Sequence, residues 1–255
     1  MNASRNQFMP ATDGPAAFSL LELLVAIALI AIVASLLLPS LNRGKASAQR
    51  IQCVSGLHQL AVATHLYWDD NNGQCFRYNG PATNYGQIYW FGWMGPGPEG
   101  QRSYDPSQAA LYPYIRARGI EICPALDYSL AQFKLKATGA SYGYGYNKFL
   151  SGTNREPAVK VSSIRHPAQT TLLADAAQIN VWQAPASPEN PMLEEWYYVD
   201  TSADQPNAHF RHSRRANVAF CDGHVGLERF VPESLDMRLP SQYVGTLRRE
   251  ILELP

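Results

Sequence analysis

The feature that most constrains this chain is an apolar segment at residues 18–38, which holds one charged side chain, Glu22. At about 1.5 Å per residue, a helix over this segment spans roughly 30 Å, about the thickness of one hydrocarbon core. A multi-pass membrane protein is excluded, because no other segment is apolar enough to span. We therefore predict a single membrane-spanning helix at the start of the chain.

Three interpretations of this segment compete. A cleaved secretory signal needs a basic start and a small-residue cleavage site after the apolar run, but the flank holds only Arg5 and the run ends in three leucines and Pro39. A plain membrane anchor leaves Glu22 unexplained, because a carboxylate inside the apolar run costs a few kcal/mol unless it is paired. The third interpretation gives Glu22 a role.

The stretch from Ala17 to Glu22 resembles the processing site of type IV prepilins. The resemblance implies that prepilin peptidase removes a polar leader, residues 1–17, by cutting before Phe18. It also implies N-methylation of the new amine of Phe18 and a role in assembly for Glu22. Pro39 lies where pilin helices carry a proline between their membrane and soluble halves. The family strongly prefers glycine before the cut, whereas this chain has Ala17.

The basic residues around the segment favour the opposite topology. Arg5 precedes it, whereas Arg43, Lys45 and Arg50 follow it. By the positive-inside rule, that bias places the C-terminal side in the cytoplasm. The resemblance implies instead a single-pass protein of the inner (cytoplasmic) membrane with an exported C-terminal domain. We follow the resemblance, because the alternative leaves Glu22 without a role.

The helical pattern continues beyond Pro39 to about Asp69, with apolar residues at three- and four-residue steps. Gly73 is the expected C′ residue that ends the helix. We thus predict a membrane half at 18–38, a soluble half at 39–72 and an exported globular domain at 73–255.

The globular part is predicted to consist of long loops around short strands. We expect one strand near 88–93, a brief helix at 108–115 and a strand at 170–174 that ends at Asp175. Hydrophobic residues make up 46% of the chain, which is enough for a core.

Three tyrosines, Tyr142, Tyr144 and Tyr146, alternate along the sequence and should face one side of a strand. Packing in the core is the favoured interpretation. The alternative is an aromatic platform for sugars, which would make the chain a membrane-tethered extracytoplasmic module that binds a glycan or a protein.

The clearest local prediction is a β-hairpin at 216–230. Asp222-Gly223 between two apolar runs is typical of a two-residue hairpin turn. This turn would place Phe220 opposite Val225 on one apolar face.

His212, nine residues and then Asp222-Gly223 resemble the H-X9-DG signature of the prepilin-type processing-associated domain. With the N-terminal motif, the resemblance runs from about residue 18 to 230. It implies an α+β, pilin-like fold, in which a long N-terminal helix packs on a small antiparallel sheet with long loops. It implies a pseudopilin, a structural subunit of a type II secretion or type IV pilus-like system. The implied partners are prepilin peptidase, other pseudopilins, the inner-membrane secretion machinery and the lipid bilayer.

No catalytic or cofactor motif is recognisable, so we expect neither an enzyme nor a cofactor. The weak metal-ligand candidates are Asp175, His212, Asp222 and His224. On one straight strand, His212 and Asp222 would lie roughly 33 Å apart, so they could meet only if the chain turns sharply at 213–215. We expect no metal, and a metal-dependent envelope enzyme stays a remote third class.

The four cysteines, Cys53, Cys75, Cys123 and Cys221, fit neither CxxC chemistry nor a zinc ribbon. An exported domain permits disulfides. We predict a bridge between Cys53, on the soluble half of the helix, and Cys123, on the domain that packs there, although the sequence leaves other pairings open.

The charge balance excludes a general nucleic-acid binder. Lys+Arg and Asp+Glu are both 21, so the formal net charge is zero. Such binders carry an excess of basic residues that neutralise phosphates, and we therefore expect no nucleic-acid partner.

Overall fold

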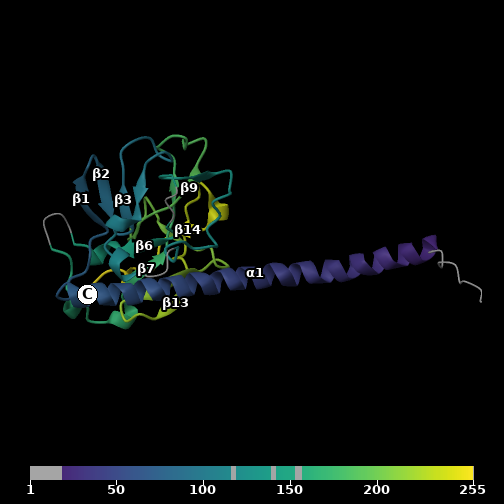
Figure 1. Ribbon diagram of the computed structural model, residues 1–255, viewed down its shortest axis with the longest axis horizontal. Coiled ribbons are helices and arrows are strands. Elements are labelled where there is room, and N and C mark those ends of the chain that lie inside the picture. Colours follow the sequence, from purple (N-terminus) through teal and green to yellow (C-terminus); the bar gives the residue numbers. More distant parts are fainter. Residues whose placement is uncertain (1–18, 116–118, 139–141, 153–156, 255) are drawn as a thin grey trace, which may run out of the picture. The chain divides into compact units, whose positions relative to one another are not determined.

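The computed structural model describes residues 19–115, 119–138, 142–152 and 157–254 (Figure 1). A long N-terminal helix is followed by short strands and 3-10 turns, so the fold is α+β as predicted. The chain divides into two compact units, residues 1–45 and 46–255. The helix and strands are α1 (Leu20–Asp70), β1 (Asn79–Thr83), β2 (Gly86–Tyr89), β3 (Gly92–Met94), β4 (Tyr104–Asp105), β5 (Phe133–Lys134), β6 (Tyr144–Asn147), β7 (Thr171–Asp175), β8 (Gln178–Asn180), β9 (Met192–Glu194), β10 (Tyr198–Val199), β11 (Ala208–His209), β12 (Ala216–Phe220), β13 (Val225–Glu228) and β14 (Val244–Gly245).

Helix α1 keeps Pro39 within it and ends at Asp70. Asn72 and Gly73 follow with φ values of 54° and 70°, and the Gly73 N–H donates to the carbonyl of Trp68 at 2.7 Å. Glycine adopts this left-handed conformation without a Cβ penalty, which explains why the helix stops here.

The second unit is built around a five-stranded sheet with the order β10-β6-β7-β12-β13. Its neighbours pair antiparallel, except that β10 pairs parallel with β6. One face packs on the C-terminal half of α1, where Leu57 and Leu60 share a core with Leu172 and Ala219 (Figure 1). The other face packs on the C-terminal segment. Because both faces are covered, every residue of β7 and β12 is buried.

Three smaller sheets surround this core in the described part of the chain. They have the orders β1-β2-β3-β4, β5-β9-β8 and β11-β14. The single strand expected near 88–93 is instead two strands, β2 and β3, which pair antiparallel. The helix expected at 108–115 is wrong: the chain forms two short 3-10 turns, Pro106–Gln108 and Tyr112–Tyr114. Pro113 has no N–H for an α-helical bond to the preceding turn, which prevents a continuous helix.

The hairpin of β12 and β13 forms, but its register differs by one residue from the prediction. Ala219, not Phe220, pairs with Val225, and the Phe220 N–H donates to the His224 carbonyl at 2.9 Å. The loop therefore has three residues, 221–223, with the positive φ at Gly223. Val225 consequently lies on the Ala219 face that packs toward α1.

Contacts of Cys221 explain the longer loop. Its N–H donates to the carbonyl of Thr170 at 2.9 Å, and its carbonyl accepts from Nε2 of His65 at 3.0 Å. Cys221 is thus held between β7 and α1 and does not pair with His224. A turn signal in the sequence carries no information about such tertiary contacts.

Replacing Gly223 by valine should lower the free energy of unfolding by about 1–3 kcal/mol, because a β-branched residue is strained at a φ of 95°. An added Cβ would meet only Cε1 of His65, at 3.4 Å, so the cost comes from the backbone and not from a clash. Thermal or urea unfolding of the full chain in detergent measures the effect. The matched control is Asp222→Ala, which removes a surface hydrogen bond in the same loop and should cost less. Equal losses in the two variants would contradict this explanation.

Candidate functional site

Glu22 lies in the first turn of α1 and forms a reciprocal cap with Ser19. The Ser19 N–H donates to Oε2 of Glu22 at 2.9 Å, and the Glu22 N–H donates to Oγ of Ser19 at 3.1 Å. This arrangement is a capping box, and it satisfies N–H groups that a helix start otherwise leaves unpaired. Glu22 therefore has a partner within its own chain. The serine three residues before the glutamate is a signal from which sequence reasoning could have found this cap.

Ala17 and Phe18 lie outside the described residues. Cleavage between them, and methylation at Phe18, stay predictions. The described chain begins at Ser19, the N-cap residue, which is the second residue after the predicted cut.

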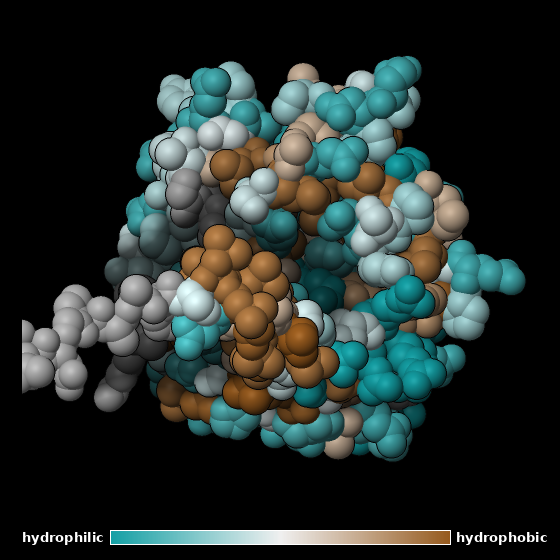
Figure 2. Space-filling view, turned by 90° about the vertical axis from the view of Figure 1, so that its right-hand side faces the viewer, coloured by the Kyte–Doolittle hydropathy of each residue, from teal (hydrophilic) through white to brown (hydrophobic). Residues whose placement is uncertain are grey.

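The first half of α1 presents apolar side chains that nothing in the described chain covers. It is long and apolar enough to cross a bilayer, and none of its most apolar stretch is buried. These side chains form the brown surface that faces the viewer in Figure 2. Apolar surface on this scale favours lipid or another protein over water. The exposed large residues are Leu20, Leu21, Leu23, Leu24, Val25, Ile27, Leu29, Ile30, Ile32, Val33, Leu36, Leu37, Leu38 and Leu41.

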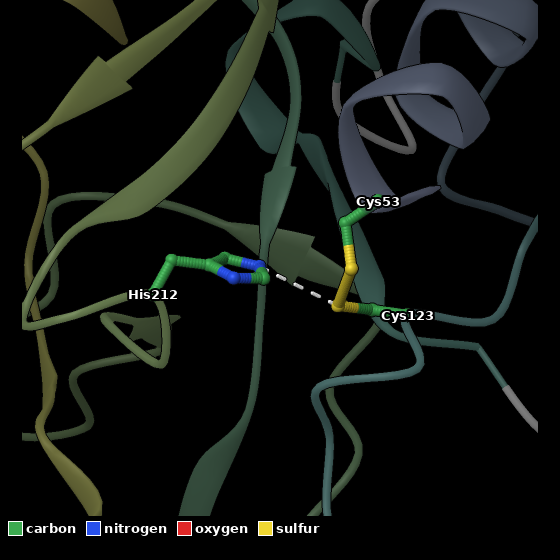
Figure 3. A group of neighbouring side chains, drawn as sticks. All are labelled: Cys53, Cys123 and His212. Atoms are coloured by element: carbon green, nitrogen blue, oxygen red, sulfur yellow. Dashed lines mark hydrogen bonds between the residues drawn. A yellow bond between two sulfur atoms is a disulfide. The ribbon is translucent and has the colours of Figure 1, made fainter. Parts of the chain in front are cut away.

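The second half of α1 is tied to the globular domain by a disulfide between Cys53 and Cys123, with the two Cα atoms 5.1 Å apart (Figure 3). Both cysteines are fully buried. The hydroxyl of Tyr144 on β6 donates to the carbonyl of Cys53 at 3.1 Å. Helix and sheet are therefore linked covalently and by hydrogen bonding at the same place.

His212 points at this disulfide (Figure 3). A tight turn with Ser213 and Arg214 at φ values of 54° and 62° follows β11 and sets the position of the ring. Backbone bonds in both directions between His212 and Arg215, of 3.0 and 3.2 Å, close the turn. Nε2 of His212 lies 3.6 Å from Sγ of Cys123.

Asp175 also lies close to Nε2 of His212. Its Oδ2 is 3.3 Å from Nε2 of His212 and accepts the Asn217 N–H at 2.6 Å. Its Oδ1 is 3.5 Å from Nη2 of Arg211. The carboxylate, the guanidinium and the imidazole are all buried, so Asp175 and Arg211 balance each other's charge where water does not reach.

Asp222 and His224 form a separate pair at the far end of β12. Oδ1 of Asp222 accepts from the His224 backbone N–H at 3.1 Å and lies 2.6 Å from its Nδ1. Both side chains are largely exposed. The chain does turn sharply after His212, but β12 then carries it away from that residue. The four weak metal candidates thus form two pairs and not one site.

Two buried glutamates were missed by sequence reasoning. The Glu194 carboxylate lies 2.9 Å from Nζ of Lys134 and also contacts Lys136. Glu195 accepts the Tyr142 N–H at 3.0 Å, and burial raises the pKa of its carboxyl to about 8. Lys134 and Glu194 meet because β5 pairs with β9 in the β5-β9-β8 sheet. No local sequence pattern predicts this pairing. The Lys134–Glu194 ion pair links β5 to β9.

The alternating tyrosines belong to the core. Tyr142, Tyr144 and Tyr146 have no exposed surface, and all three lie in the cluster that packs on α1. The packing interpretation is confirmed. These rings cannot serve as a platform for sugars, so the glycan-binding alternative loses the residues on which it depended.

Two comparisons with known proteins bear on the N-terminal segment. The family described as "Prokaryotic N-terminal methylation motif" matches residues 15–38. The N-terminal segment is pilin-like. The chain is also 37% identical over 78 residues to "Type II secretion system core protein G" of Escherichia coli (strain K12). That similarity covers 31% of this chain and 50% of the relative, so the chain spans about half the length of the curated relative it matches. No solved structure matches the chain.

Proposed function

We propose that the chain is a pseudopilin-type structural subunit of a type II secretion or type IV pilus-like system. One observation carries the proposal: the methylation motif at residues 15–38 coincides with the capped start of a helix whose apolar side chains are exposed. The similarity to a type II secretion core protein points the same way.

The proposed subunit uses the apolar half of α1 twice. Before assembly this half spans the lipid bilayer, which removes its side chains from water. After cleavage before Phe18 by prepilin peptidase, the same side chains pack against the helices of neighbouring pseudopilins. In both states, lipid or neighbouring subunits cover the apolar side chains. This explains why nothing in the described part of this chain covers them.

The proposed orientation places the globular domain outside the cytoplasm. The Cys53–Cys123 disulfide supports this orientation, because disulfides persist in oxidising compartments. The domain then acts as a structural and interaction module and not as an enzyme. We assign the H-X9-DG signature to the same domain, where His212 and Asp222-Gly223 stand at the two ends of β12.

Assembly should depend on prepilin peptidase. We expect membrane-permeant cross-linking to give a ladder of oligomers when the chain is expressed with the peptidase and the inner-membrane assembly machinery. Without the peptidase, the leader stays on the helix and the ladder should disappear, although the chain remains in the membrane fraction. An unchanged ladder in cells that lack the peptidase would contradict the proposed function.

A further inference from the structure

Cys53, Cys123 and His212 bring three metal-ligating atoms together at one buried point. The two Sγ atoms and a ring nitrogen all lie within 4.8 Å of one another (Figure 3). Asp175 adds a carboxylate oxygen 3.3 Å from Nε2 of His212. None of the four side chains has more than marginal exposure. Thiolate, imidazole and carboxylate are the groups that bind zinc in proteins.

We propose that, when the Cys53–Cys123 disulfide is reduced, the two thiolates, Nε2 of His212 and the Asp175 carboxylate bind one zinc ion. The disulfide and the metal are alternative ways of closing the same contact between α1 and the globular domain. The proposal concerns residues outside the membrane segment and does not depend on the pseudopilin assignment.

Two of the spacings between ligand atoms match those of a tetrahedral zinc site. With zinc bonds of about 2.3 Å to sulfur and about 2.0–2.1 Å to nitrogen and oxygen, neighbouring N and S ligands lie about 3.6 Å apart and N and O ligands about 3.3 Å apart. The structure has 3.6 Å between His212 and Cys123, and 3.3 Å between His212 and Asp175. The sulfurs, which are bonded in the disulfide, must separate to about 3.8 Å in the same geometry. Asp175 must also move closer to them, because the group of atoms within 4.8 Å of one another holds only Cys53, Cys123 and His212.

The charges also balance in both states. In the disulfide state, the Asp175 carboxylate faces the guanidinium of Arg211, so the buried group is neutral. In the zinc state, the three negative charges of two thiolates and one carboxylate are matched by Zn²⁺ and the guanidinium of Arg211. The net charge of the buried group is again zero. Burying an unbalanced charge is costly, so this compensation favours the site. Oδ1 of Asp175 and Nε of Arg211 have no hydrogen-bond partner among the described residues, whereas Nη2 of Arg211 donates to the carbonyls of Gly143 and Ala176.

The exchange between the two states is chemically complete. A dithiol or phosphine reductant supplies two electrons, and two protons from water give two thiols in place of the S–S bond. Zinc then displaces both thiol protons as the two Zn–S bonds form, because the thiolate is the ligand. The His212 imidazole binds in its neutral form through Nε2.

The test uses the full chain in detergent. The parent for the test carries Cys75→Ala and Cys221→Ala, so that Cys53 and Cys123 are its only cysteines. Wild-type protein is measured in parallel. We expect the phosphine-reduced chain to bind one Co²⁺ with the thiolate-to-metal charge-transfer band and the visible bands of tetrahedral cobalt. Zn²⁺ should displace the cobalt, and the oxidised chain should show neither band.

His212→Ala should lower the affinity for zinc, because it removes a ligand. The loss should exceed the about 10–100-fold in affinity that follows when only a hydrogen-bond partner of a ligand is removed. His224→Ala is the matched control, since His224 pairs with Asp222 at the far end of β12, and it should bind as the parent does. If reduction unfolds the chain, zinc should restore its circular dichroism. A folded reduced chain without the charge-transfer band, a reduced chain that zinc does not refold, or wild-type affinity in His212→Ala would each overturn the proposal.

Discussion

Replacing Glu22 by alanine should abolish assembly while leaving the chain inserted in the membrane. Within the lipid, a carboxylate needs a partner to offset the cost of its charge. The free amine that processing creates at Phe18 of a neighbouring subunit would supply one. Removing the carboxylate makes the segment more apolar, so insertion should persist. Cross-linking of membranes should show monomers alone.

The cap between Ser19 and Glu22 requires a control, because Glu22→Ala removes both the charge and a helix-capping side chain. Glu22→Gln keeps a capping side chain and removes the charge, since glutamine also serves in capping boxes. Ser19→Ala keeps the charge and breaks the cap. We expect Glu22→Gln to fail in assembly and Ser19→Ala to assemble. If Glu22→Gln gives the wild-type ladder, the glutamate acts through its own helix and the intersubunit pairing is wrong.

Loss of the Cys53–Cys123 bridge should lower the free energy of unfolding of the metal-free chain by about 2–4 kcal/mol, because the bridge closes a long loop in the unfolded chain. The sequence separation of the two cysteines is 70 residues. The variant is Cys53→Ala combined with Cys123→Ala, and the measurement is urea unfolding in detergent with a chelator present. Non-reducing peptide mapping of the wild-type chain should recover the two cysteines in one linked peptide pair.

Reductant sensitivity separates the bridge from ordinary packing. Reductant should destabilise the wild-type chain and have no effect on the double variant. Cys75→Ala is the matched control: Cys75 is buried, unbridged and kept as a thiol, since burial raises its pKa to about 11. That variant should keep the full response to reductant. Mapping that finds Cys53 and Cys123 free, or joined to other cysteines, would contradict the prediction.

The sequence was sufficient for the parts of the fold that local patterns determine. The apolar run and its helical continuation predicted α1, and Gly73 marked its end. A short apolar run predicted β7, and the turn residues at 222 and 223 predicted that β12 and β13 form a hairpin. In each case the signal lies within a few residues of the feature that it specifies.

Features that depend on tertiary contacts were not accessible in this way. The hairpin register is set by Cys221, which is held by Thr170 and His65 from distant parts of the chain. His212 and Asp222 look like one motif in the sequence, but a turn and a strand separate them, and His212 lies instead against Cys123. Cys221 meets Thr170 and His65, and His212 meets Cys123, only in the folded chain, because the residues of each contact come from different elements.

The mass of the N-terminal peptide of the chain extracted from the membrane tests the pseudopilin assignment most directly. The processing motif predicts that the mature chain begins at Phe18, one residue before the helix cap at Ser19. We expect intact-mass and peptide analysis to show the loss of residues 1–17 and the addition of one methyl group to the new amine. A mature chain that still begins at Met1 would contradict the assignment.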